Sequence, residues 1–193
     1  MDELILATNN EHKVKEFKEL FPHMKIQSLK EAHIVSNPEE TGTTFLENAK
    51  IKAISASLQT SHLVIADDSG LEIEALNGFP GVFSARFMEG ATSKEKCLGI
   101  LQKLQGQTNR NAQFRCSLVV AKQGQILFAV DEVCPGVIAT SIEGENGFGY
   151  DPIFIESSTG ICFAKMSSEE KNLYSHRGKA CRKLKDYFRE ETR

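Results

Sequence analysis

The spacing of hydrophobic residues in the first half of the chain switches between two periods. Short segments that are typical of strands occur at residues 4–7, 25–28 and 62–66, and the first and last of them are apolar runs. Between the runs, apolar residues recur at helical spacing in two stripes: Val14, Phe17 and Phe21, and then Phe45, Ala49, Ala53 and Ala56. Thr44 and Glu47 form a capping-box pattern at the start of the second stripe. This order of elements predicts a fold that begins as a β–α–β unit.

The second half of the chain has a different pattern. Apolar runs at 115–121 and 125–133 are separated by Lys122-Gln123-Gly124, which predicts a hairpin, and a further short strand is expected at 153–155. Helices are predicted from two capping-box pairs and one apolar stripe: Thr92 with Glu95, Ser167 with Glu170, and Ala180, Leu184 and Phe188. The first of these helices is expected to end near Gly106. A β–α–β start followed by antiparallel strands implies an α/β fold with a mixed sheet flanked by helices.

Length and composition indicate one globular domain. The 193 residues are 40% hydrophobic and 25% charged, so residues 1–193 are expected to form a single domain without a separate linker. The formal net charge of −3 argues against a general nucleic-acid or membrane-surface binder, but it leaves room for a small basic pocket. No apolar stretch approaches the roughly 20 residues of a membrane-spanning helix. The start of the chain lacks the pattern of a signal peptide, so a cytoplasmic protein is expected.

The cysteines fit the same expectation. Their number, five, is odd, and no two form a C-x-x-C pair. This favours reduced thiols over a disulfide framework or a zinc site.

Two adjacent carboxylates, Asp67 and Asp68, follow the apolar run at 62–66 and precede Ser69-Gly70. Strand side chains alternate between faces, so the two carboxylates diverge unless the chain turns between them. A carboxylate at a strand end can bind Mg²⁺, orient a water molecule or accept its proton. The alternative is an Asp-Ser-Gly turn in which one aspartate caps backbone amides, and the pair taken alone favours that turn.

The loop from Thr8 to Lys13 joins the first strand to the first helix, where backbone N–H groups and the helix dipole favour a phosphate. A cation near a helix start is misplaced by roughly 0.3–1 kcal/mol unless an anion lies beside it. Asn9 or Asn10 can cap the helix. The alternative is an ordinary loop with a solvated lysine, since neither a Walker sequence nor G-x-G-x-x-G is present.

Two further loops carry candidate ligands. Residues 38–42 include Glu39 and Glu40, which are either solvated loop charges or the source of a further carboxylate for a metal site. Residues 146–152 contain two glycines that permit close ligand approach. Phe148 or Tyr150 on this loop can stack on a nucleobase, or both can fold back into the core.

The stretch 170–178 concentrates basic residues. If it formed one unbroken helix, Lys171 and Arg177 would lie on different faces. If Ser175 instead caps a new helix, His176 and Arg177 lie at its start, which suggests an anionic or carbonyl-rich ligand. The alternative is a His-Arg pair that belongs to the surface.

Together these stretches resemble one family, the inosine triphosphate pyrophosphatases, also described as dITP/XTP pyrophosphatases, and in particular its bacterial branch. The matching segments are ATNNEHK, EETGTTFLENAKIKA, IADDSGLEIEALNGFPGVFSARF, GFGYDPIF and EEKNLYSHRGKA. They follow in order over nearly the whole chain. The resemblance implies a mixed, elongated and twisted sheet flanked by helices, with a substrate cleft between two lobes. It also implies that a homodimer hydrolyses deaminated purine nucleoside triphosphates (ITP, dITP, XTP) to the monophosphate and pyrophosphate in a Mg²⁺-dependent reaction. This reaction would clear the deaminated nucleotides from the nucleotide pool.

The resemblance also implies residue roles. Glu40 and Asp68 would be metal ligands, Asp68 would accept a proton from the attacking water, and Asp67 would be a supporting carboxylate. The residues that would contact substrate are Thr8, Asn9, Asn10, Glu11, His12, Lys13, Ser69, Phe148, Gly149, Tyr150, Asp151, Lys171, His176 and Arg177. Among them, Phe148 would stack on the base. One departure is Asn9, which stands where the family commonly has glycine, and asparagine tolerates the left-handed backbone that glycine allows.

Base selection has a physical rationale within this hypothesis. Donors from Arg177 or from nearby backbone would favour the 6-oxygen of inosine and xanthine over the amino group of adenine, because each unsatisfied buried group costs roughly 1–3 kcal/mol. Two other functions stay open: a phosphohydrolase for pyrimidine triphosphates with the same metal chemistry, and a nucleotide-binding regulator without catalysis. The presence of Lys13, Glu40, Asp68 and Lys171 argues against the regulator.

Overall fold

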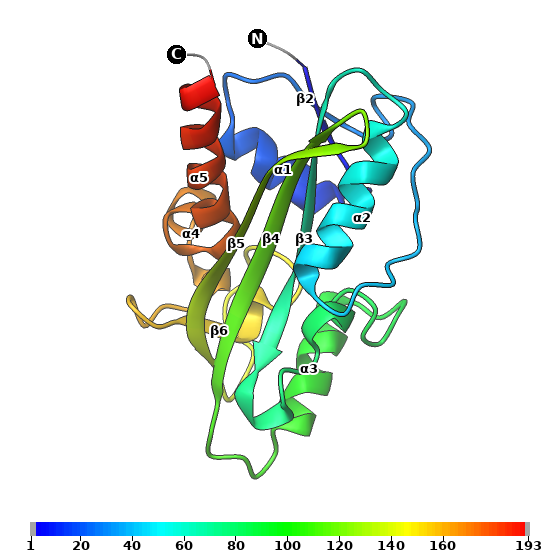
Figure 1. Ribbon diagram of the computed structural model, residues 1–193. Coiled ribbons are helices and arrows are strands. Elements are labelled where there is room, and N and C mark those ends of the chain that lie inside the picture. Colours follow the sequence, from blue (N-terminus) through cyan, green and yellow to red (C-terminus); the bar gives the residue numbers. More distant parts are fainter. Residues whose placement is uncertain (1–2, 192–193) are drawn as a thin grey trace. The chain divides into compact units, whose positions relative to one another are not determined.

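The computed structural model describes residues 3–191 (Figure 1). The strands are β1 (Leu4–Leu6), β2 (Ile26–Ser28), β3 (Leu63–Ile73), β4 (Asn111–Lys122), β5 (Gln125–Ile138) and β6 (Phe154–Glu156). The α-helices are α1 (Glu11–Leu20), α2 (Phe45–Ser57), α3 (Ser93–Lys103), α4 (Ser168–Tyr174) and α5 (His176–Glu191). Four short 3₁₀ turns lie at Glu74–Leu76, Gly81–Phe83, Asp151–Ile153 and Phe163–Lys165. Within this part of the chain, no helix combines the length and apolar character needed to cross a membrane.

The six strands form one mixed sheet in the order β2-β1-β3-β4-β5-β6. β1 runs parallel to both of its neighbours, with Leu4 opposite Ile26 of β2 and opposite Leu63 of β3. β5 and β6 are antiparallel. β4 and β5 are joined by a two-residue turn in which Gln123 and Gly124 have φ values of 49° and 81°, the geometry of a tight hairpin. The predicted α/β class with a mixed sheet is therefore confirmed.

The chain divides into two compact units, and three strands and one helix contribute residues to both. Unit 1 contains residues 3–68, 116–132 and 180–191 of the described chain, and unit 2 contains residues 69–115 and 133–179.

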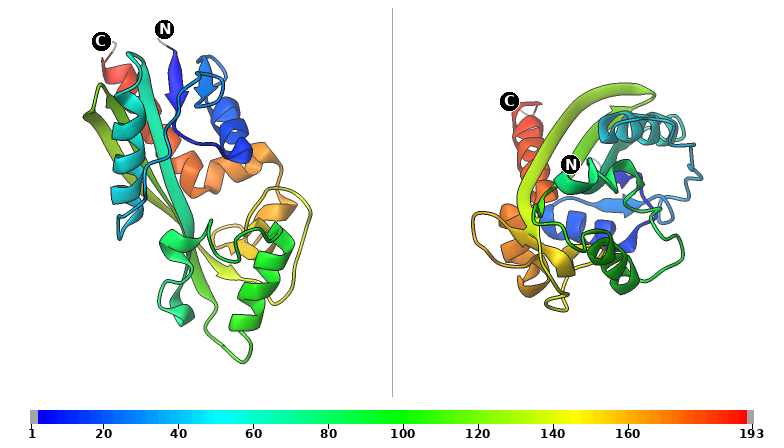
Figure 2. Two further views of the ribbon diagram at one scale, coloured as in Figure 1. Left: turned by 90° about the vertical axis from the view of Figure 1, so that its right-hand side faces the viewer. Right: turned by 90° about the horizontal axis from the view of Figure 1, so that it is seen from below.

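In unit 1, helices cover both faces of the sheet (Figures 1 and 2). One face packs on α1 and α5 through a cluster that includes Leu4, Leu6, Phe17, Ile65, Cys116, Leu118, Ala180 and Leu184. The other face packs on α2 through a cluster that includes Ile5, Ala49, Ala53, Val64, Ala66 and Val119. The alternation of these residues along β1, β3 and β4 gives each face its own core. The alanine stripe predicted for the second helix is its buried side.

The core of unit 2 is aromatic. The ring of Phe114 lies 4.6 Å from that of Phe154, 5.9 Å from that of Phe163 and 4.8 Å from the imidazole of His176. These rings pack with Leu71, Ile73, Cys97, Ile100 and Tyr150, all buried. Unit 2 thus has a hydrophobic core of its own.

The predicted helix starts are confirmed, because Thr44, Thr92 and Ser167 each form a complete capping box with the glutamate three residues later. The largest error concerns β3, which was expected to end at residue 66. It continues to Ile73, so Asp67 and Asp68 lie inside a strand and the expected Asp-Ser-Gly turn is wrong. The strand continues beyond the end of β1 because β4, its other neighbour in the sheet, extends to Asn111. β4 and β5 are likewise longer than predicted.

Candidate active site

Asp67 and Asp68 point to opposite faces of the unit 1 sheet, as strand alternation requires. Asp67 follows Ile65 on the face covered by α1 and α5, and Asp68 follows Ala66 on the face covered by α2. Both are buried, with exposed fractions of 1% and 8%. Each carboxylate therefore has to find its partner on a different helix.

Lys13 of α1 is the partner of Asp67. Its ammonium forms a short ion pair with Oδ1 of Asp67. The thiol of Cys116 donates to the other oxygen, Oδ2, at 3.1 Å. A cation at a helix start was expected to need an anion beside it, and in this structure Asp67 is an anion in that place.

Lys52 of α2 is the partner of Asp68, and sequence reasoning missed it. Its Nζ lies 2.6 Å from Oδ1 of Asp68 and 3.4 Å from Oε1 of Glu40. Lys52 falls within the segment EETGTTFLENAKIKA, but the pattern alone reads as one charge beside a buried alanine stripe. Asn48, four residues earlier on α2, is fully buried. That burial is known only from the structure, so no signal in the sequence distinguished Lys52.

The two lysines approach the same backbone oxygen. Nζ of Lys52 lies 3.1 Å from the carbonyl oxygen of Asp67, and Nζ of Lys13 lies 3.5 Å from it. Two cations from helices on opposite faces of the sheet thus meet at one point of β3. Such a concentration of positive charge suits a ligand that carries several negative charges.

The protonation equilibria of this group are perturbed. Burial raises the pKa of the Asp68 carboxyl above its ordinary value, although the charges of Lys52 and Lys13 act in the opposite direction. Burial is the largest single influence on Lys52 and lowers its pKa, but the carboxylates of Asp68, Glu40 and Asp67 together raise the pKa by more, so the net shift is upward. Oδ2 of Asp68 is buried and has no hydrogen-bond partner among residues 3–191. A water molecule or cation that reached this oxygen would supply the hydrogen-bond or ionic partner that it lacks.

The loop that carries Glu40 is held by Asn48. Oδ1 of Asn48 accepts a hydrogen bond from the backbone N–H of Gly42 at 2.8 Å. A Cβ at position 42 would lie only 2.6 Å from that oxygen, so a side chain would force the loop away. Glu40 is thereby kept beside Lys52.

The residues fit a magnesium ion. Glu40 and Asp68 both contact the ammonium of Lys52, which places two carboxylates around one position. Mg²⁺ is commonly bound by one or two carboxylates together with waters and substrate phosphates. Among residues 3–191, no group of three His, Cys, Asp or Glu side chains is arranged to hold a metal by itself. A cation here would therefore depend on oxygens from substrate and water.

The first loop is organised around Asn10. Its side chain accepts from the backbone N–H groups of His12 and Lys13 and so caps α1. Thr8 in turn accepts from the N–H of Asn10 at 3.1 Å. Asn9 does not have the positive φ that would explain a glycine there, so left-handed tolerance is not what makes asparagine acceptable. The four residues from Asn9 to His12 are exposed at the surface of unit 1.

In unit 2, Asp151 organises the glycine-rich loop. Its Oδ2 accepts from Nζ of Lys171 at 2.6 Å and from the backbone N–H of Phe148 at 2.9 Å. Gly147 has φ of 74°, and a Cβ there would lie 2.0 Å from the same oxygen. The buried carboxylate thus fixes both a basic side chain and the loop that bears the aromatic ring.

Phe148 and Tyr150 have different environments. The ring of Phe148 is half-buried, with Nζ of Lys171 4.8 Å and Cζ of Arg177 5.9 Å from its centroid. Tyr150 is buried, and its hydroxyl donates to the carbonyl oxygen of Ser84 at 2.7 Å. The ring of Tyr150 therefore belongs to the core, as one of the two alternatives held. Gly149 accepts from the thiol of Cys97 at 3.4 Å.

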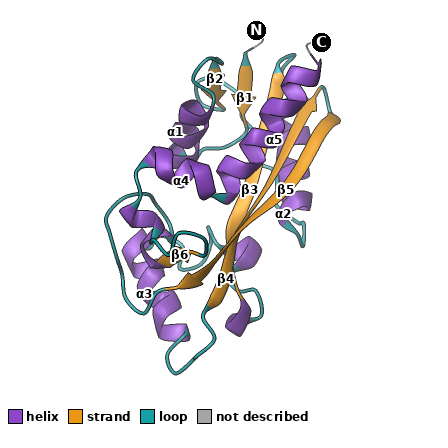
Figure 3. Ribbon diagram, turned by 90° about the vertical axis from the view of Figure 1, so that its left-hand side faces the viewer, coloured by secondary structure: helices purple, strands orange, loops and turns teal. Residues whose placement is uncertain are grey.

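The break between α4 and α5 occurs at Ser175 (Figure 3). Ser175 has extended backbone geometry, and its hydroxyl accepts from the N–H of Gly178, so the alternative in which Ser175 caps a new helix is confirmed. His176 and Arg177 are both buried. One guanidinium nitrogen of Arg177 donates to the hydroxyl of Ser69 at 2.7 Å. Ser69 follows Asp68 directly in the chain.

Comparison with known proteins identifies the family. The model of the Ham1 family matches residues 4–187. The chain belongs to the Ham1 family. The resemblance carried by its motifs is thereby confirmed.

Ham1-family relatives cover the chain almost completely. It is 45% identical over 97% of its length to the dITP/XTP pyrophosphatase of Streptococcus pyogenes serotype M18 (strain MGAS8232), of which it spans only 59%. It is 42% identical over 98% of its length to the dITP/XTP pyrophosphatase of Methylacidiphilum infernorum (isolate V4), and covers 96% of that protein. The structure of a HAM1 protein from Coxiella burnetii superposes with a TM-score of 0.88 at 40% identity, over 98% of this chain and all of that one.

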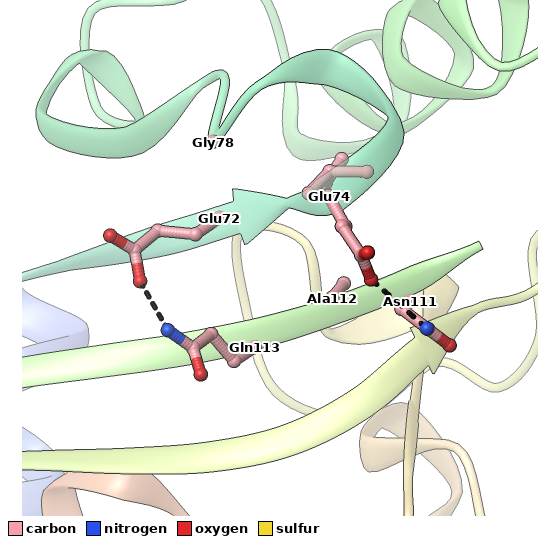
Figure 4. A pocket seen from close by; sticks show the side chains of 7 residues that line it. Glu72, Glu74, Gly78, Asn111, Ala112 and Gln113 are labelled. Atoms are coloured by element: carbon pink, nitrogen blue, oxygen red, sulfur yellow. Dashed lines mark hydrogen bonds between the residues drawn. The ribbon is translucent and has the colours of Figure 1, made fainter. Parts of the chain in front are cut away.

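This Ham1-family chain also has a pocket of about 410 Å³ in unit 2 that none of the candidate residues lines. Its polar side chains pair with one another across β3 and β4: Gln113 donates to Glu72 at 2.7 Å and Asn111 to Glu74 at 3.0 Å (Figure 4). Arg115 also contacts Glu72. These pairs account for the acidic residues as cross-strand contacts.

Proposed function

We propose that this protein hydrolyses deaminated purine nucleoside triphosphates, namely ITP, dITP and XTP, to the monophosphate and pyrophosphate in the presence of Mg²⁺. The names of its relatives, dITP/XTP pyrophosphatase, support the proposal. The observation that carries it is that the ammonium groups of Lys13 and Lys52 both approach the carbonyl oxygen of Asp67. Beside them lies Asp68, whose pKa is raised and whose Oδ2 has no hydrogen-bond partner among the described residues. In the cell, this reaction would remove such nucleotides from the precursor pool.

Glu40 and Asp68 would hold the magnesium ion. When bound, Mg²⁺ would neutralise charge on the phosphate oxygens and orient the triphosphate of the substrate for cleavage. The role of Lys52 is to keep the two carboxylates together, since it contacts both of them.

Asp68 is the proposed proton acceptor for the attacking water. A carboxyl group whose pKa is raised by burial is a stronger base than an exposed aspartate, and no donor from the described part of the chain competes for Oδ2. Lys13 and Lys52 stabilise the negative charge that moves onto the leaving pyrophosphate. The loop from Thr8 to Lys13 supplies N–H groups for the same phosphates.

The base is proposed to contact the residues of unit 2. Phe148 offers a half-buried ring for stacking, and Lys171 and Arg177 lie near that ring. Arg177, with His176 beside it, would donate to the 6-oxygen of the purine, and Ser69 would contact substrate. Asp151 and Lys171 hold the loop of Phe148, Gly149 and Tyr150 in place.

The wider setting belongs to the same proposal. The whole chain would act as a single pyrophosphatase domain. The active form would be a cytoplasmic homodimer that binds neither nucleic acid nor membrane.

The test is turnover of ITP, XTP, GTP and ATP by purified protein with Mg²⁺, with pyrophosphate and orthophosphate recorded separately. Rapid pyrophosphate release from ITP and XTP, with ATP and GTP nearly unchanged, supports the proposal. Orthophosphate release contradicts the cleavage position. Asp68→Asn is expected to abolish turnover, and near wild-type turnover by that variant contradicts its role as the base.

A further inference from the structure

Cys116 lies in the middle of β4 and is fully buried. A buried cysteine ordinarily acts as a small apolar side chain. This one is different, because its sulfur lies 3.1 Å from Oδ2 of Asp67. The thiol therefore donates into a buried carboxylate whose other oxygen binds Lys13.

The arrangement follows from strand alternation. Cys116 belongs to the same apolar cluster as Leu118 and Ile65, which identifies it with the sheet face that Asp67 shares. Ser117, the next residue of β4, instead donates to Asp131. Of these two neighbouring residues of β4, Cys116 donates to Asp67 and Ser117 donates to a different carboxylate.

A thiol has a specific advantage in this place. It is a weak and uncharged donor, so it satisfies one carboxylate oxygen without neutralising the charge that attracts Lys13. With Oδ2 bound to Cys116, rotation of the carboxylate breaks a hydrogen bond in a buried environment, where the loss is large. The direction of Oδ1, and with it the position of the Lys13 ammonium, is fixed.

We propose that Cys116 and Asp67 are positioning residues that fix the Lys13 ammonium for a polyphosphate ligand. This inference rests on the proposed function for the identity of the ligand, but not for the hydrogen-bond chain itself. Lys13 touches the phosphates, and the other two act through it.

The test uses variants of Cys116 that separate hydrogen bonding from packing. Cys116→Ser keeps a donor, Cys116→Val keeps apolar volume without a donor, and Cys116→Ala removes both. If positioning is the role, KM for ITP rises about tenfold in the valine and alanine variants and stays near wild type in the serine variant. If Cys116 only fills space, valine is tolerated and serine is not, and that result overturns the inference. Cys181, equally buried in the same cluster, provides matched Ala and Ser controls for which KM is expected to be unchanged.

A second readout does not depend on turnover. The S–H stretching band of Cys116, identified by subtracting the spectrum of Cys116→Ala, is expected at lower wavenumber than the bands of the other thiols. In Asp67→Asn it should shift upward, because the acceptor loses its charge. A Cys116 band that is unaffected by Asp67→Asn overturns the hydrogen-bond chain.

Binding of inorganic tripolyphosphate separates this inference from the proposed function. One outcome is that the wild-type protein binds tripolyphosphate but does not hydrolyse ITP, and that Cys116→Val binds tripolyphosphate about tenfold more weakly than wild type. In that case the proposed function fails and the inference stands. If ITP turnover is normal and all Cys116 variants keep the wild-type KM, the inference fails and the proposed function stands. Failure to bind tripolyphosphate and to hydrolyse ITP overturns both.

Discussion

Nζ of Lys52 lies 2.6 Å from Oδ1 of Asp68, although the two residues come from a helix and from a strand. The contact joins helix α2 to Asp68 of β3, the carboxylate that is proposed to act as the base. Lys52 also holds Asp68 and Glu40 near one another, since its ammonium contacts both carboxylates.

Replacing Lys52 by methionine is expected to lower kcat for ITP by about 10²–10³-fold, the effect of removing one preorganised charged donor from a site of this kind. Steady-state kinetics at saturating Mg²⁺ measures the loss. Lys50→Met is the matched control, because residues two apart on a helix lie about 200° apart around its axis. An unchanged kcat in Lys52→Met contradicts the role of this lysine.

Gly147→Ala is expected to destabilise the protein by about 2 kcal/mol or more, because it adds strain at a positive φ and a Cβ that collides with the Asp151 carboxylate. Gly149→Ala is the matched comparison: its φ is 61°, but no heavy atom lies within 4 Å of the added Cβ, so about 1 kcal/mol is expected. Urea denaturation of both variants measures the difference. Equal losses would show that the contact with Asp151 contributes nothing.

Glu31 provides a pH prediction in unit 1. Hydrogen bonds from the backbone and side chain of Ser28, together with Lys18, lower the pKa of Glu31 to about 2. A lowered pKa stabilises the fold above the ordinary glutamate value of 4.5, and this contribution disappears as the pH falls towards 2. Because Glu31 is exposed, the effect is expected to be small.

The corresponding measurement compares wild type with Glu31→Gln by denaturation at pH 7 and at pH 2.5. The variant should be less stable at pH 7, and the two proteins should converge at low pH. Glu19→Gln, on α1, serves as the control. A gap that widens on acidification contradicts the sign of the shift.

The thiols should be inert in the folded protein. All five cysteines are buried, and burial raises the pKa of Cys97 and that of Cys134 to about 12 each. Since the thiolate is the reactive species, iodoacetamide at pH 8 is expected to modify none of them until denaturant is added. Mass spectrometry after timed alkylation checks this expectation. Modification of Cys97 or Cys134 at the rate of a free thiol would contradict it.

The same shifts predict a loss of stability in alkali. The unfolded thiols ionise near pH 9, while the folded ones keep their protons, so unfolding is favoured as the pH rises above that value. Cys97→Ala should lessen the dependence between pH 9 and pH 11. A variant with the same pH slope as wild type would show that Cys97 does not contribute.

The amino-acid sequence by itself determined the local structure of this protein and the motifs that contain its candidate site residues. Thr44, Thr92 and Ser167 act on backbone groups three residues away, so capping signals are legible in the chain. The alanine stripe of α2 and the hairpin turn at Gln123-Gly124 are local in the same sense. The motifs that carry the family resemblance are also contiguous segments.

Tertiary structure alone decided which residues meet. The bounds of β3 depended on a neighbouring strand about 45 residues away, so the sequence suggested a turn where the strand continues. Whether Asp67 was a cap, a ligand or a partner of Lys13 depended on the face of the sheet that α1 covers. Lys52 and Cys116 have no distinguishing local pattern, because their importance lies in contacts 16 and 49 residues away along the chain. Ion pairs and buried hydrogen bonds depend on distance in space, and only the packing of helices on the sheet sets those distances.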